Sequence, residues 1–390
     1  MKVLVLTDDR IGPTMAGSAL RAWEIACALA KKNHVVCLSA APGSDRPSLP
    51  GPEIVEKPPW SWAEAVIAPV WSLPPRAFLG HHILIADGAT PLLAELEAMP
   101  QSTEILRRRR TAAARIPLVA ARADAILAAG SAQIDWWQKK LHPLRPKLPI
   151  LDLPFGIPDQ PPPPERDEIP GIPRDWAVVL WWGGVWPWLD LDTLLEARAL
   201  LEDAPLSIVV PTAARPGAST SRFTRADLRS AMKRCALKPP QVVALDTWIP
   251  YHERHRILHR TSLIAVLHKA GYEADLCFRT RAMDGVWAGV PLLLTEGGEV
   301  ARHVQHNGWG AIVPPGEPKT IAGLLELVLS EKEQLRFRRN LSMGRDSWTW
   351  SNLVDPLSKI LKDLPTTGRK GLISPATKAI FTLLDLRRKS

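Results

Sequence analysis

The chain has 390 residues, 46% of them hydrophobic and 23% charged, which gives room for two domains with large cores and excludes a disordered chain or a small disulfide-stapled fold. Its 49 Lys and Arg residues against 40 Asp and Glu residues leave a net charge of +9, which favours nucleotides, anionic lipid or nucleic acid as partners without choosing among them. The four cysteines are widely spaced and match neither a disulfide framework nor a zinc motif. No apolar run reaches about 18 residues and no signal peptide is visible, so we expect a cytoplasmic protein.

The N-terminal half alternates between strand and helix patterns. A glycine-bearing loop at 12–18 and a helical pattern follow the first apolar run. Apolar runs of strand length occur at residues 2–7, 34–40, 81–87 and 123–130. This order predicts a doubly wound parallel sheet.

A proline-rich stretch near residue 160 separates this half from a second series of the same kind. The later apolar runs lie at residues 176–184, 206–212, 241–248, 262–269 and 290–297. We therefore predict an α/β protein with two tandem Rossmann-like domains that face a cleft. The predicted parts are a first domain at 1–155, a linker at 156–175, a second domain at 176–350 and a helical tail at 351–390, which can cross back to the first domain.

Two glycine-bearing loops are candidates for binding a phosphate. In the loop at 12–18, Gly17 lets backbone NH groups approach an anion at a helix N-terminus, although a simple tight turn explains the glycines equally well. Gly183 and Gly184 end the predicted strand at 176–184 in the same way. Of the tryptophans around this pair, Trp181 is expected in the core, and Trp186 is a candidate for stacking on a ligand.

The stretch from His268 to Gly298 carries the densest set of polar residues between a predicted strand and helix. Arg279 and Arg281 suit a diphosphate because each guanidinium is permanently charged and offers several donors. The carboxylate of Asp284 can accept both hydroxyls of a ribose. Solvated ions at the start of a surface helix are the alternative interpretation of these residues.

The linker sequence PFGIP, the run WIPYHER and above all FRTRAMDGVWAGVPLLLTEGGEVARHV with GAIVPPG resemble glycosyltransferases of the GT-B fold, in particular the retaining nucleotide-sugar transferases of family 4. The resemblance covers residues 1 to about 360. It implies a nucleoside diphosphate sugar as co-substrate on the second domain, with no other cofactor and no metal, and an acceptor on the first domain.

The resemblance also implies roles for individual residues. Asp284 takes the position of the family carboxylate that contacts ribose. The other family acid would fall at Leu276, so Glu273 is assigned to the donor sugar hydroxyls. The family's Arg and Lys pair after the second-domain glycines is absent, which gives Arg279 and Arg281 the neutralisation of the diphosphate. The remaining donor-side candidates are Gly17, Gly183, Gly184, Trp186, His268 and Gly298, and the weaker acceptor-side candidates are Asp87 and His82.

The sequence thus predicts a glycosyltransferase that moves a sugar, with retention and without metal, to a bacterial glycan or lipid-linked acceptor. A non-catalytic nucleotide-sugar-binding partner of another transferase is the alternative. A nicotinamide oxidoreductase would share the sheet but would need the GxGxxG fingerprint, which is absent.

The positive charge is concentrated in two stretches. Residues 101–147 hold ten basic and three acidic residues, and residues 366–390 hold six basic and one acidic residue. The second stretch ends in an amphipathic pattern at 374–390, which suits either anionic lipid or packing against the protein. We therefore expect a location on the inner face of the membrane as well as in the cytoplasm, and no nucleic-acid partner, since no RNP, KH or zinc pattern occurs.

Overall fold

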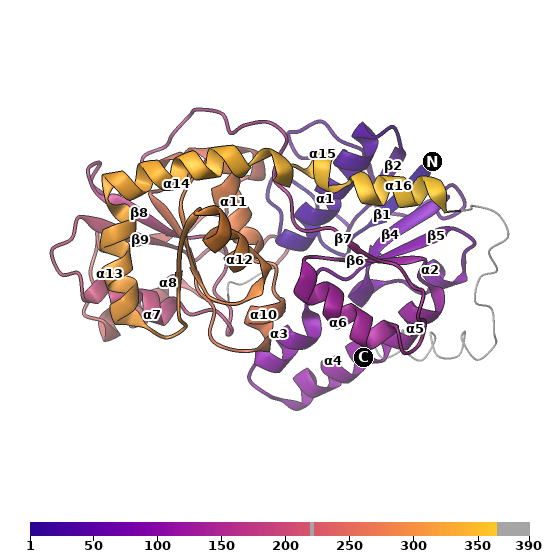
Figure 1. The fold of residues 1–390 in the computed structure, drawn as a ribbon, viewed down its shortest axis with the longest axis horizontal. Coiled ribbons are helices and arrows are strands. Elements are labelled where there is room, and N and C mark those ends of the chain that lie inside the picture. The colour runs from indigo at the N-terminus through magenta and orange to yellow at the C-terminus, as the bar shows by residue number, and fades with distance from the viewer. Residues whose placement is uncertain (219–221, 365–390) are drawn as a thin grey trace. The chain divides into compact units, whose positions relative to one another are not determined.

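The computed structural model describes residues 1–218 and 222–364, and the predicted amphipathic helix at 374–390 lies outside them. The chain divides into two compact units (Figure 1). The first unit comprises Met1–Gly12, Gly17–Pro154 and the described residues from Trp350 onward. The second comprises Pro13–Ala16 and Phe155–Thr349.

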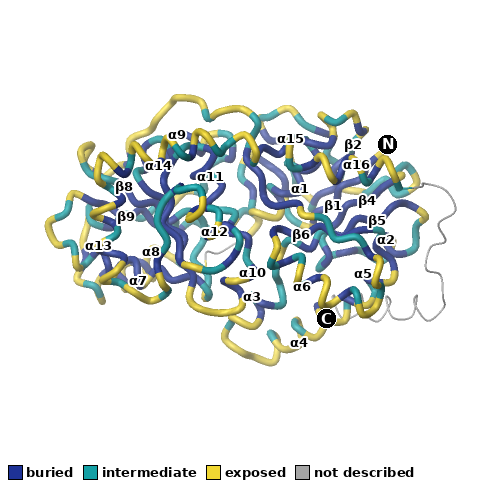
Figure 2. The backbone as a smooth tube through the Cα atoms, viewed as in Figure 1, coloured by how far each residue is buried: buried dark blue, intermediate teal, exposed yellow. Residues whose placement is uncertain are grey.

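The first unit is built on a seven-stranded, wholly parallel sheet of order β3-β2-β1-β4-β5-β6-β7. Its strands are β1 (Lys2–Leu6), β2 (Val35–Ser39), β3 (Glu53–Val55), β4 (Ala65–Pro69), β5 (Ile83–Asp87), β6 (Ala125–Ala128) and β7 (Ile150–Asp152). Its helices are α1 (Gly17–Lys31), α2 (Pro75–Leu79), α3 (Leu92–Ala98), α4 (Thr103–Ala113), α5 (Arg115–Arg122), α6 (Ser131–Leu141), α15 (Trp350–Leu353) and α16 (Asp355–Asp363). The central strands are buried, as Figure 2 shows, because helices cover a parallel sheet on both faces.

The last two described helices pack on the first unit. Helix α15 contacts α1, and α16 is tied to the loop after α1 by Ser358, whose Oγ lies 3.0 Å from Nε2 of His34. Lys32 forms an ion pair of 2.6 Å with Asp355. The chain therefore leaves the second unit at Thr349 and completes the first unit with its C-terminal helices.

The second unit repeats the plan with six parallel strands in the order β10-β9-β8-β11-β12-β13. The strands are β8 (Ala177–Trp181), β9 (Leu206–Pro211), β10 (Val242–Leu245), β11 (Leu263–Val266), β12 (Leu292–Thr295) and β13 (Gly310–Val313). The helices are α7 (Leu191–Ala199), α8 (Arg225–Arg234), α9 (Arg254–Arg260), α10 (Tyr272–Leu276), α11 (Thr280–Ala288), α12 (Gly298–Asn307), α13 (Pro318–Leu329) and α14 (Glu331–Gly344). The predicted pair of doubly wound α/β sheets is confirmed.

The proline-rich stretch is part of the second unit and is held against α9 and α11. Nε2 of His259 lies 2.7 Å from the carbonyl oxygen of Pro163, and Nε1 of Trp287 donates to the carbonyl of Gln160 at 2.8 Å. Arg256 and Asp167 form an ion pair of 3.3 Å. The segment predicted as a linker is therefore docked along much of its length.

Across residues 1–218 and 222–364, no helix is both long and apolar enough to span a bilayer.

Candidate functional site

In both sheets the strand order reverses next to the first strand of the unit, and sheets of this kind bind ligands at the carboxyl ends of the strands beside such a reversal. In the second unit the reversal lies between β8 and β11. Gly183 and Gly184 follow β8, and His268 follows β11. An isolated bridge between Leu189 and His268 joins the two loops, so the sheet places these predicted residues beside one another.

Gly183 and Arg281 lie side by side. Gly183 has φ 95°, and a Cβ atom built on it would lie 2.8 Å from Nε of Arg281. Any larger residue would strain the backbone and displace the guanidinium. Arg281 is half-buried and makes no hydrogen bond or ion pair within the described residues. Burial lowers the pKa of Arg281 to about 10, so the group is still charged at neutral pH. This is a cation available to an anion beside a glycine turn.

Arg279 has a different role from the one predicted. Its side chain is 1% exposed, and its Nη1 and Nη2 atoms donate to the backbone carbonyls of Thr295 and Glu296, the second at 2.9 Å. These donors are already used within the protein, so the geometry does not support a direct contact with a diphosphate. Arg279 instead fixes the loop between β12 and α12.

That loop leads into the N-terminus of α12. Gly297 and Gly298 have φ 89° and 71°, and a Cβ atom on Gly298 would lie 2.9 Å from the carbonyl oxygen of Ala274. The N-cap residue, Gly297, has no side chain that could accept from the first NH groups of the helix, and Oδ1 of Asp275 would lie 3.0 Å from a Cβ atom built on Gly297. The helix dipole adds partial positive charge at this end. Gly298 is therefore required for the close approach of α10.

Glu273 and His268 form a buried pair. Oε2 of Glu273 lies 2.8 Å from Nδ1 of His268, and the two residues are 3% and 2% exposed. The backbone NH of His268 donates to Oγ1 of Thr295 at 3.0 Å. Burial lowers the pKa of His268, and the Glu273 carboxylate opposes the shift. Oε1 of Glu273 is buried and has no hydrogen-bond partner in the described chain.

Asp284 is held by two side chains that were not predicted. Its Oδ1 forms an ion pair of 2.7 Å with Nε of Arg254, and its Oδ2 accepts a hydrogen bond of 2.7 Å from Nε1 of Trp182. The guanidinium of Arg254 lies over the rings of Tyr251 and Trp287, at 3.7 and 4.0 Å from their centroids. Both carboxylate oxygens of Asp284 therefore have a partner within the protein, and a ribose hydroxyl could use only their remaining lone pairs. The ribose contact stays a prediction.

Trp186 and Trp188 stack on each other, with centroids 5.2 Å apart and planes 7° apart. Arg222 lies 5.0 Å from the centroid of the Trp186 ring, and a Cβ atom built on Gly184 would lie 3.4 Å from the indole nitrogen of Trp186. The π-surface of Trp186 is thus engaged by protein groups. Stacking on a ligand ring would require these neighbours to move, so the geometry does not favour the predicted platform.

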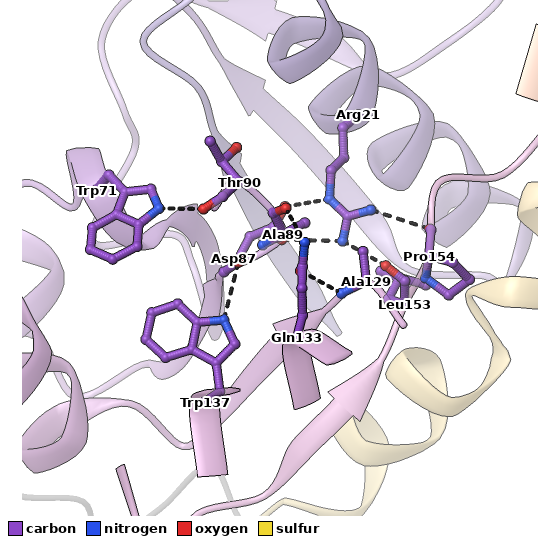
Figure 3. Close-up of polar contacts among 11 residues, drawn as sticks. Arg21, Trp71, Asp87, Ala89, Thr90, Ala129, Gln133, Trp137, Leu153 and Pro154 are labelled. Carbon is purple, nitrogen blue, oxygen red and sulfur yellow. Dashed lines mark hydrogen bonds and ion pairs between the residues drawn. The ribbon is translucent and has the colours of Figure 1, made fainter. Parts of the chain in front are cut away.

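In the first unit, Gly17 begins α1 and is exposed, and a Cβ atom built on it would have no heavy atom within 4 Å, so its place in donor binding stays a prediction. Asp87 ends β5 and receives a two-point contact from Arg21, with distances of 2.7 and 3.1 Å (Figure 3). The same guanidinium donates to the carbonyls of Leu153 and Pro154. Asp87 therefore joins α1 to the end of the first sheet, and its acceptor role stays a prediction.

The loop after Asp87 is fixed through its backbone carbonyls. Trp137 donates to Gly88 at 3.1 Å, Gln133 to Ala89 at 2.9 Å and Trp71 to Thr90 at 2.7 Å (Figure 3). Three consecutive carbonyls are thus each bound by a side-chain NH. These bonds hold the loop in place at the edge of the sheet where ligands bind in such folds.

His82 lies at the opposite edge, because it precedes β5 whereas Asp87 ends it. It is 7% exposed, and its Nε2 lies 3.1 Å from the carbonyl oxygen of Ala77. Its assignment to the acceptor side is therefore wrong, since its edge of the sheet is not the ligand-binding one.

Burial lowers the pKa of His82 to about 4, below its unfolded value of about 6.5. Between about pH 4 and pH 6.5 the unfolded chain therefore binds more protons at His82 than the folded chain does. The folded state keeps its full stability with respect to His82 above about pH 6.5 and loses stability as the pH is lowered toward 4. We expect His82 to cost about 2 kcal/mol of stability at about pH 5. Urea unfolding of wild type and His82→Gln at about pH 7 and pH 5 should show a smaller acid loss in the variant. An equal loss in both proteins would contradict this.

Residues Arg254 and Trp182 were missed because their pairing with Asp284 spans 30 and 102 residues. Trp182 directly precedes the glycine pair, and Arg254 ends the run WIPYHER, so each lies inside a motif that the sequence does reveal. In the part of the chain that the structure describes, no group of three or more His, Cys, Asp or Glu side chains is placed to hold a metal ion.

No protein-family model matches the sequence, and no curated protein matches it. The structure is similar to sucrose-phosphate synthase from Thermosynechococcus elongatus, with 13% identity, 93% of this chain and 98% of that chain covered, and a TM-score of 0.67. It is similar to HepE from Anabaena in complex with UDP-glucose, with 15% identity, 93% and 100% covered and a TM-score of 0.62. WaaG, a glycosyltransferase involved in lipopolysaccharide biosynthesis, has 15% identity, 92% and 99% covered and a TM-score of 0.65. These likenesses show the fold: the chain has the GT-B fold of glycosyltransferases.

Proposed function

We propose that this protein is a glycosyltransferase that moves a sugar from a nucleoside diphosphate sugar to a bacterial glycan or lipid-linked acceptor, in the synthesis of a polysaccharide. The observation that carries the proposal is the juxtaposition of Arg281 with Gly183 at the switch point of the second sheet. Similar structures solved with bound UDP, UDP-glucose or UDP-2-fluoro glucose support a nucleotide-sugar donor.

Each group at the edge of the second sheet has a place in this reaction. The diphosphate lies against the Gly183 turn, Arg281 and the N-terminus of α12, which together stabilise the negative charge that develops on the leaving group. The free oxygen of Glu273 accepts a hydrogen bond from a donor sugar hydroxyl, and His268 holds the carboxylate in place. Arg279 positions the loop and does not touch the substrate.

We propose that the transfer proceeds with retention and without metal. The bond between the sugar C1 and the diphosphate oxygen breaks, and the acceptor oxygen bonds to C1 on the same face. The departing phosphate oxygen takes the acceptor proton. An arginine and a helix N-terminus provide positive charge for this step, so the proposal needs no metal ion.

A non-catalytic nucleotide-sugar-binding partner is the second candidate. It is favoured by Leu276 at the position of the family acid and by the missing Arg and Lys pair after Gly184. It makes the same ligand contacts but breaks no bond.

A titration of the pure protein with UDP, GDP, ADP, dTDP and NADH tests the donor class. We expect one nucleoside diphosphate to bind and NADH not to bind, because the fold lacks the dinucleotide fingerprint. Binding of NADH alone would overturn the proposal. Slow release of free sugar from the matching nucleotide sugar separates an enzyme from a binding partner, which would bind the donor and leave it intact.

For a lipid-linked acceptor we propose a peripheral location on the inner face of the membrane, supported by the basic residues of 101–147. In the structure, ion pairs neutralise part of the positive charge of residues 101–147. Arg122 is buried in an ion pair with Asp124, and Arg107 and Arg109 pair with Glu104 and Glu97.

A further inference from the structure

Helix α14 presents an outward face of unusual composition. Phe337 and Leu341 on its inner face are buried, and Phe337 packs into the core of the second unit. At 100° per residue, six exposed residues share the opposite face. They are Lys332, Leu335, Arg336, Arg339, Ser342 and Met343, and we call them the α14 face.

Two large apolar side chains stand out on the α14 face. Leu335 is 65% exposed and Met343 is 69% exposed, the two highest values among the exposed large hydrophobic residues of the described chain. They are eight residues apart, about 12 Å along the helix, and Figure 2 shows exposed segments along α14. A single exposed leucine is ordinary, but two large apolar side chains on one face form a surface that water solvates poorly.

The charge on the α14 face is positive, with one exposed acid, Glu331, at its edge in the first turn of the helix. Lys332, Arg336 and Arg339 surround the apolar pair, and none of the six residues is acidic. Arg336 forms an ion pair with Glu333, which lies toward the buried side, so Lys332 and Arg339 are the two cations of this face that have no ion pair within the described chain. Arg338 points away from the face, since it donates to the carbonyl of Gly289 at 3.2 Å.

We infer that α14 docks this face on an anionic lipid bilayer. A helix of 14 residues, about 21 Å long, can lie flat at the interface with leucine and methionine in the acyl boundary and its cations among anionic headgroups. An acidic soluble protein would satisfy the three cations, but the bilayer also takes up apolar side chains that protrude by two thirds of their surface. The inference rests on this helix and does not depend on glycosyl transfer.

Residues 101–147 are the rival surface. They expose two leucines, Leu106 and Leu144, and six basic residues, which are Arg107, Arg108, Arg110, Lys139, Lys140 and Lys147. Leu106 lies on α4, whereas Leu144 follows α6. Helix α4 exposes Leu106 together with arginines, but Leu106 is its one large exposed apolar side chain, whereas α14 exposes both Leu335 and Met343 on one face.

Flotation of the full chain with vesicles tests the inference. We expect binding to vesicles of phosphatidylcholine with phosphatidylglycerol and none to phosphatidylcholine alone. Binding should fall steeply at about 1 M salt, where the Debye length is about 3 Å. The double variant Leu335→Ser/Met343→Ser should lose about tenfold or more in partitioning, because it removes both groups that insert. The double variant Arg336→Gln/Arg339→Gln should lose a similar amount of partitioning onto the vesicles, but only at low salt.

The matched apolar control is Leu200→Ser/Leu327→Ser, which changes two side chains of 52% and 56% exposure outside the α14 face and should bind as wild type does. All these variants should keep the unfolding transition and donor binding of wild type. The inference is overturned if wild type does not bind the anionic vesicles, or if the α14 variants bind as wild type does. It is also overturned if Arg108→Gln/Lys140→Gln abolishes binding while the α14 variants keep it, since the rival surface then carries the contact. These outcomes leave the test of glycosyl transfer untouched.

Discussion

Replacing Arg281 with alanine is expected to weaken nucleoside diphosphate binding by roughly ten- to a hundredfold, because a charge-assisted contact to phosphate contributes about 1.5–3 kcal/mol. Binding of the corresponding nucleoside should change little, since the guanidinium lies beside the Gly183 turn and has no other partner in the described chain. Calorimetric titration with the diphosphate and the nucleoside measures both effects.

Three controls define this result. Arg281→Lys keeps the charge and should recover part of the affinity, and Arg234→Ala removes an exposed arginine that pairs with Asp192 elsewhere and should change nothing. Gly183→Ala should also weaken diphosphate binding, because its Cβ atom would lie 2.8 Å from Nε of Arg281. Equal losses for nucleoside and diphosphate in Arg281→Ala would contradict the assignment.

The different fates of Arg279 and Arg281 show where sequence reasoning reaches its limit. Two arginines at i and i+2 look equivalent in a loop that leads into a helix. In the structure Arg279 is the N-cap residue of α11, whereas Arg281 is the second residue of the helix. Residues two apart on a helix point about 200° away from each other, so the two side chains diverge. One enters the buried loop before α12 and the other reaches the glycine turn.

The fold was predictable because its central strands are apolar on both faces. Runs such as residues 2–7 and 262–269 are typical of parallel strands covered by helices. Strand β4 was not predicted because Ala65–Pro69 is short and lies among tryptophans and prolines. Strand β13 was not predicted because Gly310–Val313 begins with glycine and was interpreted only as part of a motif. Their positions follow from pairing with β1 and β12, which is not visible in the local sequence.

The candidate site was predictable as a set of loops but not as a set of contacts. Positions after the strands identified Gly183, His268 and Gly298, because ligands bind at the carboxyl ends of parallel strands. The pair between His268 and Glu273 depends on both side chains turning into the core. The anchoring of Asp284 depends on α9 packing on α11. Such packing brings together residues whose separation in sequence carries no signal.

Asp284→Asn is expected to lower the free energy of unfolding by about 3 kcal/mol, because it leaves a buried guanidinium without its counter-ion. The side chain of Arg254 is 5% exposed and that of Asp284 is 20% exposed, so water can replace little of the lost interaction. The asparagine amide can still accept from Trp182, but it then turns its NH₂ group toward Arg254. Urea unfolding of wild type and variant measures the loss. Asp192→Asn is the surface control, since it breaks a pair whose partners are both more than 60% exposed and should cost less than about 1 kcal/mol.

A double variant separates the structural role of Asp284 from its predicted contact with ribose. In Arg254→Met/Asp284→Asn no charge remains unpaired, and methionine can fill the space between Tyr251 and Trp287, so most of the lost stability should return. If Asp284 also accepts a ribose hydroxyl, nucleoside binding should stay weak in both the single and the double variant. Recovery of nucleoside binding together with stability would show instead that the carboxylate acts only by holding Arg254. An asparagine variant as stable as wild type would contradict the anchoring itself.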